Sequence, residues 1–191
     1  TRNLTLYIGN SDNSLTIGQG GAGGDNQGAQ SFKLSRSYTV TAADLQLREF
    51  LGSPGNMTIT VETDSSNVPS GTLVDASSAA AAILQGSISA GYSFVRATFS
   101  GGFVLDAGTS YWLRARVTTS AVNNAYSWGR DSVTATYPDG NAAGQLGGIW
   151  TKFPSDDANF TILGYEASSQ YESWLYVNTD NFVTWRLSSS G

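Results

Sequence analysis

The segment from Met57 to Val74, MTITVETDSSNVPSGTLV, constrains the fold more than any other, because two extended runs in it are separated by turn residues. Met57, Ile59 and Val61 alternate with polar residues, and this period of two is typical of a strand with one buried face. The short polar side chains at 64–67 favour a turn, because they hydrogen-bond to nearby backbone. The segment therefore predicts a β-hairpin.

A second run, Tyr111–Val117 (YWLRARV), shows the alternation most clearly. One face carries Tyr111, Leu113, Ala115 and Val117, and the other carries Trp112, Arg114 and Arg116. A face with tryptophan between arginines predicts cover by neighbouring chain or by a partner. Phe50 falls out of phase with Leu45 and Leu47, which predicts a bulge or a strand end. The stretch Ala79–Leu84 leaves a helical turn and a strand edge or loop equally open.

The composition indicates one all-β domain. The chain has 191 residues, of which 22 are glycine and 12% are aromatic, and this mixture suits many short strands joined by turns. Helix-forming stretches rich in Glu, Lys and Leu are missing from the sequence. We therefore expect an antiparallel β-sandwich of jelly-roll type with extra strands at both ends.

Charge and residue usage exclude several kinds of function. The formal net charge is -5 and the basic residues are scattered, which disfavours nucleic-acid binding because phosphate contacts need clustered Lys and Arg. The absence of Cys and His excludes disulfides, thiol catalysis and imidazole-based sites. No apolar run approaches the roughly 18 residues of a membrane span. Because no Met or signal peptide precedes Thr1, we expect a processed chain or a fragment.

Several motifs follow one another in a recognisable order. They are Gln30-Ser31-Phe32, the hairpin Ile59–Leu73, the strand Ala107–Val117, YSWG at 126–129, and the Asp-Asp-x-x-Phe that begins at Asp156. Over about 30–164 the chain resembles jelly-roll modules of phage virion and tail proteins and of bacterial extracellular proteins, which are labelled choice-of-anchor or carbohydrate-binding-like domains. This resemblance implies a non-catalytic surface module that displays, attaches or binds glycans.

The sequence divides into three parts on this basis. Residues 1–29 hold N-terminal strands and a Gly-rich loop, 30–165 form the jelly-roll core, and 166–191 form a C-terminal hairpin packed on the core or on a neighbouring subunit. The hairpin supplies four candidate interface residues, Trp174, Tyr176, Phe182 and Trp185. The Gly-rich stretch Gly18–Gly28 is expected to be a flexible loop or linker, because a phosphate-binding loop needs a following helix and usually a lysine.

Aromatic residues in the loop-rich parts predict a glycan-binding groove. The candidate ligand-binding residues are Tyr126, Trp128, Arg130, Tyr137 and Trp150, with Asp131, Asn141, Gln145 and Phe153 nearby. Aromatic rings stack on the apolar C–H surface of sugars, and polar side chains hydrogen-bond to the hydroxyl groups. The alternative is that Trp128 and Trp150 are packing residues of the sandwich.

Acidic residues raise two further hypotheses. Asp156, Asp157 and Asn159 are candidate oxygen ligands of a structural Ca²⁺, with a solvated turn as the alternative, and Asp64 and Asp139 are weaker candidates. Hydrolysis of a glycosidic bond needs two facing carboxylates. The candidates by residue type are Glu49, Glu62, Glu166 and Glu172, and Glu62 is expected to face solvent. We predict no catalytic residue and no cofactor or metal beyond this candidate Ca²⁺.

The leading hypothesis is a non-enzymatic phage virion protein, namely a decoration, fibre or tail-associated domain at the virion surface. Its partners would be the capsid, the tail or neighbouring subunits, with cell-surface polysaccharide as a candidate ligand and with an oligomer as the expected state. The alternative is an extracellular bacterial carbohydrate-binding or adhesion module.

Overall fold

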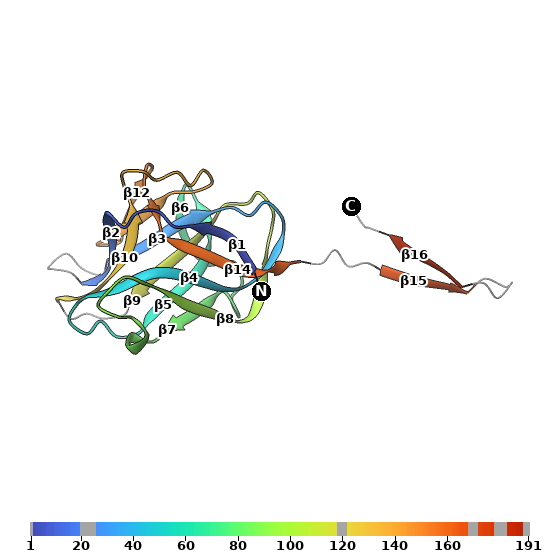
Figure 1. Cartoon of the computed structure of the whole chain (residues 1–191), viewed down its shortest axis with the longest axis horizontal. Coiled ribbons are helices and arrows are strands. Elements are labelled where there is room, and N and C mark those ends of the chain that lie inside the picture. Colours follow the sequence, from blue (N-terminus) through green and yellow to red (C-terminus); the bar gives the residue numbers. More distant parts are fainter. Residues whose placement is uncertain (1, 20–25, 118–121, 168–171, 178–182, 189–191) are drawn as a thin grey trace.

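The computed structural model describes residues 2–19, 26–117, 122–167, 172–177 and 183–188. In this part of the chain two antiparallel sheets pack face to face as a β-sandwich (Figure 1). The first sheet contains β1 (Arg2–Tyr7), β2 (Asn13–Gln19), β4 (Tyr38–Leu51), β8 (Ser93–Leu105), β10 (Asn124–Asp131), β13 (Asp157–Ala158) and β14 (Phe160–Glu166). The second contains β3 (Gln27–Phe32), β5 (Met57–Ser65), β6 (Val68–Leu73), β7 (Ala80–Ile83), β9 (Tyr111–Val117), β11 (Ala142–Leu146) and β12 (Ile149–Phe153).

Four antiparallel strand pairs are nested one inside the next along the chain. β2 pairs with β10, β3 with β9, β4 with β8, and β5 with β7. Successive pairs alternate between the two sheets, which is the arrangement of a jelly roll. The predicted fold class is therefore confirmed. β2 belongs to the roll, which differs from the prediction that residues 1–29 lie outside the jelly-roll core.

The remaining strands extend the roll. β14 pairs with β4 and carries β1 at the edge of the first sheet, while β11 and β12 extend the second sheet beyond β3. β15 (Glu172–Val177) and β16 (Val183–Ser188) pair with each other in a separate two-stranded sheet (Figure 1). Extra strands are thus present toward both ends of the chain.

The side chains of the four predicted interface residues fall outside what the structure describes. Phe182 is not described, and Trp174, Tyr176 and Trp185 are described only by their places in the strand register. The interface stays a prediction, and so does the packing of the hairpin on the core or on a neighbouring subunit.

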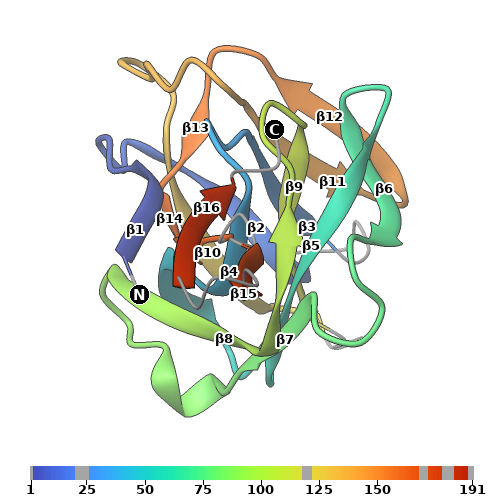
Figure 2. The ribbon, with the colours of Figure 1, turned by 90° about the vertical axis from the view of Figure 1, so that its right-hand side faces the viewer.

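The core lies between the two sheets, which Figure 2 shows on opposite sides of the molecule. The predicted alternation builds it, because Met57, Ile59 and Val61 of β5 are fully buried and so are Leu113 and Ala115 of β9. The opposite faces of these two strands point away from the core. The second sheet therefore has an outer face that is free to carry other chemistry.

Two local expectations are settled by strand pairing. Phe50 is the extra residue of a bulge, because its neighbours Glu49 and Leu51 pair with consecutive residues of β10. The stretch Ala79–Leu84 contains the strand β7 and not a helical turn, because four of its residues pair with β5.

We predict that Ile59→Ala destabilises the fold by about 2–5 kcal/mol, because it leaves a cavity between the sheets. Val133→Ala is the control, because Val133 is 80% exposed, and it should change stability by less than about 0.5 kcal/mol. Urea unfolding followed by tryptophan fluorescence measures both. Equal losses in the two variants would contradict this placement of the core.

Candidate functional site

The outer face of the second sheet is centred on Arg114 of β9. Strand register places Arg114 between Ala29 of β3 and Thr60 of β5, and places Ala143 of β11 beside Ala29. Both alanines are fully buried. Small residues beside a long cationic side chain leave room for larger groups from the neighbouring strands to close over this surface.

Arg114 is held in one orientation by a network of charge-assisted hydrogen bonds. Its Nη1 donates to Glu62 Oε1 at 2.8 Å, and its Nε donates to Gln27 Oε1 at 2.7 Å. Glu62 also accepts hydrogen bonds from Thr60 Oγ1 and from the amide of Gly71, both at 2.9 Å. The two side chains of the ion pair are 14% and 2% exposed, so this pair is largely removed from water.

The expectation that Glu62 faces solvent is wrong. Its side chain does point away from the sandwich core, as the alternation predicts, but the outer face is itself covered at this point. A buried carboxylate without partners would be costly, and the three donors around Glu62 offset that cost. Glu62 is therefore a structural anchor for Arg114.

Two tryptophans cover this outer face. Trp112 is fully buried, packs with Ala29 and Ala143, and donates its indole N–H to Asp64 Oδ1 at 2.7 Å. Trp150 of β12 is half-buried and packs against the same cluster. The Arg114 guanidinium carbon lies 5.7 Å from the centroid of the Trp150 ring, within the range of a cation–π contact. Trp150 is thus braced by its neighbours while part of its surface meets solvent.

Tyr126 and Trp128 do not contribute to a glycan groove, and the prediction for these two residues is wrong. Both lie on β10 with fully buried side chains that face the sandwich core. Tyr126 donates its hydroxyl to the Gly55 carbonyl at 2.6 Å, and Trp128 donates its indole N–H to the Asn159 carbonyl at 2.8 Å. Burial raises the pKa of Tyr126 to about 12. The alternative interpretation of Trp128 as a packing residue describes the structure.

Arg130 and Tyr137 lie at the end of β10 and in the following loop. Arg130 is buried, pairs with Asp156 at 2.6 Å and lies over the Phe153 ring at 4.4 Å. Tyr137 is half-buried, with its ring centroid 5.5 Å from that of Phe160. The five predicted ligand residues therefore do not form one groove. Trp150 is the member of that set that lies on the outer face of the second sheet.

Two aspartates face each other where β10 meets β13. Asp131 and Asp157 are paired in the ladder, and both are buried. Burial alone would raise the pKa of Asp131, but hydrogen bonds from Thr134, Val133 and Asn10 lower it to about 2. Burial raises the pKa of Asp157.

The candidate Ca²⁺ ligands have other roles in the described structure. Asp156 pairs with Arg130, and Asp157 accepts a hydrogen bond from the Tyr137 amide at 3.0 Å. The oxygen of the Asn159 side chain accepts from the Gly9 amide at 2.6 Å. Within the described ranges, no group of three or more acidic, histidine or cysteine side chains is placed to hold a metal ion. The solvated-turn alternative is also inaccurate for Asp157 and Asn159, because both are buried.

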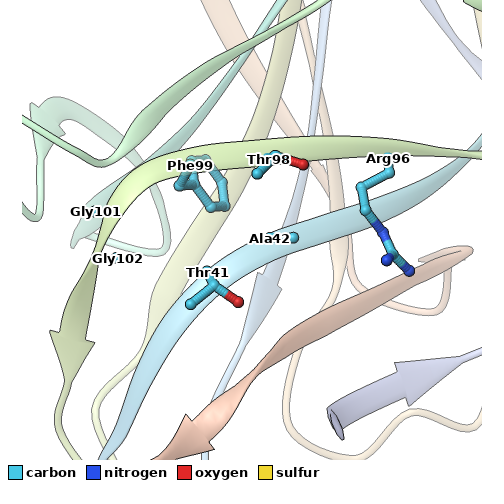
Figure 3. A pocket seen from close by; sticks show the side chains of 7 residues that line it. All are labelled: Thr41, Ala42, Arg96, Thr98, Phe99, Gly101 and Gly102. Carbon is cyan, nitrogen blue, oxygen red and sulfur yellow. The ribbon is translucent and has the colours of Figure 1, made fainter. Parts of the chain in front are cut away.

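A shallow hollow lies on the first sheet, between β4 and β8, with a volume of about 420 Å³ (Figure 3). It is lined by Thr41, Ala42, Arg96, Thr98, Phe99 and Gly101-Gly102. Arg96 is bonded through Nε and Nη2 to both carboxylate oxygens of Asp44, at 2.7 and 2.8 Å. The charge of its one cation is thus compensated, and no half-buried tryptophan lines it. The outer face of the second sheet is the better candidate site.

No protein-family model matches the sequence, and no curated protein matches it at a significant level. Among solved structures, the chain is similar to a family two carbohydrate esterase from Cellvibrio japonicus, with 8% sequence identity and a TM-score of 0.30. The likeness covers 88% of this chain and 33% of the esterase, so the chain spans about a third of that protein's length. In the described part of the chain, no helix has the length and apolar character needed to cross a membrane.

We predict opposite pH effects for the two paired aspartates. The pKa of Asp131 is lowered from 3.8 to about 2, so its contribution to stability is present above about pH 4 and is lost as the pH falls toward 2. The stability gap between wild type and Asp131→Asn should shrink over that range. The pKa of Asp157 is raised, so its protonation relieves the cost of burying a charge. Wild type should therefore gain stability relative to Asp157→Asn as the pH falls.

Chemical denaturation at a series of pH values measures both gaps. Gaps that stay constant with pH, or that change in the same direction for the two variants, would contradict the assignment.

Proposed function

We propose that this protein is a non-enzymatic binding module whose second sheet binds a saccharide on its outer face, at Trp150. The observation that carries this proposal is a half-buried tryptophan braced by Arg114 on a sheet. Aromatic faces stack on sugar rings, and a braced ring loses little conformational entropy on binding. Gln145 pairs with Trp150 in the ladder, so its half-buried amide lies beside the ring, and the half-buried Gln27 is the next residue along the same row, on β3. Amides supply the hydrogen bonds that sugar hydroxyls need.

The acidic residues of this face favour binding over hydrolysis. Glu62 is committed to Arg114, Thr60 and Gly71, and Asp64 accepts hydrogen bonds from the indole N–H of Trp112 and from the Asn67 amide. A glycosidase needs a carboxylic acid and a carboxylate that are both directed at the scissile bond. Carboxylates that stabilise their own sheet instead support a role in recognition.

The second part of the proposal concerns attachment to a larger assembly. The resemblance to phage virion and tail modules implies a decoration, fibre or tail-associated domain at a virion surface, and a secreted bacterial carbohydrate-binding or adhesion module is the alternative. The β15–β16 hairpin supports attachment, because its strands pair with no strand of the sandwich among the described residues. An isolated two-stranded sheet is marginally stable in water, so this hairpin calls for a partner such as capsid, tail or a neighbouring subunit.

We predict that Trp150→Ala weakens saccharide binding at least about tenfold, equivalent to about 1.4 kcal/mol, because it removes the stacking surface. Phe94→Ala is the matched control, because Phe94 is an aromatic residue of the first sheet that is 40% exposed. A glycan array followed by titration calorimetry measures affinity, and thermal melting checks that both variants fold. Full binding by Trp150→Ala, with loss of binding in Phe94→Ala, would place the site on the first sheet and contradict the proposal.

We also predict that a chain ending at residue 167 loses any self-association of the full chain while its sandwich stays folded. The truncation removes β15 and β16 and leaves every ladder of the two large sheets intact. Light scattering measures the oligomeric state, and circular dichroism checks the β content. A truncated chain that associates as the full chain does would exclude the hairpin as the attachment element.

A further inference from the structure

We infer that the saccharide recognised by the outer face of the second sheet is anionic, with carboxylate groups that meet Arg116 and Lys152. This inference rests on the proposed function and adds the chemical class of the ligand. It is carried by the charges that remain on this face after its internal ion pairing is complete. The side chains of Arg116 and Lys152 are both exposed.

The acidic residues of this face are already used by the fold. Glu62 compensates Arg114, with their side chains only 2% and 14% exposed. Asp64 accepts the indole N–H of Trp112. The seven strands of this sheet contain no Asp or Glu other than Glu62 and Asp64. Glu62 is thus used by Arg114, and Asp64 lies six residues along β5 from Thr58, the residue opposite Arg116, which is about 20 Å away along the strand.

The two remaining cations lie on this face, Lys152 on the same strand as Trp150 and Arg116 three strands away. Arg116 lies two residues beyond Arg114 on β9 and therefore shares its outward face, opposite Thr58 of β5. Lys152 lies two residues beyond Trp150 on β12, opposite Ala143. No ion pair within the described part of the chain involves Arg116 or Lys152.

The strand order sets the distance between these cations. β12, β11, β3 and β9 are consecutive neighbours, so Lys152 and Arg116 are three strand spacings apart, about 14 Å across the sheet, and they are offset by two residues along the strands. Trp150, Gln145 and Gln27 form a row across β12, β11 and β3, with Lys152 two residues along β12 from the ring and Arg116 beyond Gln27 on β9. A saccharide lying across the strands would stack on the ring, bond to the amides and bring its carboxylates to both ends.

Elsewhere in the described part of the chain, Arg48 lies over the rings of Phe50 and Tyr92, while three other arginines each have a carboxylate partner. Arg36, Arg96 and Arg130 are each paired with a carboxylate, namely Glu166, Asp44 and Asp156. The chain as a whole carries a net charge of -5, which repels polyanions. A pair of exposed, uncompensated cations on one face of an acidic protein therefore points to a specific anionic ligand and not to general attraction.

The test compares acidic polysaccharides with their own neutral forms. Polygalacturonate, alginate and hyaluronate are each offered to the full chain beside carboxyl-reduced samples of the same polymer. We expect at least one acidic form to bind at least tenfold more tightly than its reduced form. Its affinity should fall as ionic strength rises from about 0.01 to about 1 M, because the Debye length shortens from about 30 Å to about 3 Å.

Charge-removing variants assign the effect to this face. The double variant Arg116→Gln, Lys152→Gln should lose at least tenfold in affinity for the acidic polymer while keeping the melting temperature of wild type. Arg36→Gln is the control, because it removes an exposed cation of the same type that is paired with Glu166. It should leave the affinity unchanged.

The outcomes separate this inference from the proposed function. Reduced polymers that bind as tightly as acidic ones through Trp150, or a double variant with wild-type affinity, would overturn the anionic ligand while saccharide binding stands. Failure of every acidic, reduced and neutral glycan on the array to bind through Trp150 would overturn the proposed function, and this inference with it.

Discussion

Burial of apolar side chains between two antiparallel sheets is the constraint on which the rest of the structure depends. Each strand gives one face to the core, so the position of its outward residues follows from the same alternation. On β5 and β9 the inward residues Ile59 and Leu113 fix the register that brings Glu62 and Arg114 together. The candidate site is therefore a consequence of core packing and not of a separate loop structure.

Burial of the Arg114–Glu62 ion pair on the outer face has an energetic cost, because both charges are removed from water. An ion pair that is nearly removed from water contributes little net stability, but loss of one partner leaves a buried, uncompensated charge. The hydrogen bonds to Glu62 and Gln27 hold the Arg114 guanidinium in one position, and there it contacts the ring of Trp150. Such pre-organisation is what a binding surface needs, because a ligand then pays less to order the protein.

Much of the fold was predictable, and much of the site was not. Periodicity gave the strands of the hairpin around Ile59 and the strand Tyr111–Val117, because side-chain alternation is a local property. Periodicity does not show that both faces of β10 are buried, and a groove position for Trp128 is therefore a wrong prediction. It also did not show that β5 pairs with β9, because strand pairing between distant segments is set by tertiary packing. The role of Glu62 could have been found in the sequence, because alternation puts both Glu62 and Arg114 on the faces of their strands that point away from the core.

The most direct test of the account is a nitrogen-15 NMR titration of the full chain with the acidic and neutral polysaccharides, followed on the indole N–H signals of its 5 tryptophans. The account predicts that the signal of Trp150 shifts with ligand and saturates. The signal of Trp128, buried in the core of the sandwich, should stay in place. Saturable shifts that leave Trp150 unchanged would contradict the central claim that this outer face is the binding surface.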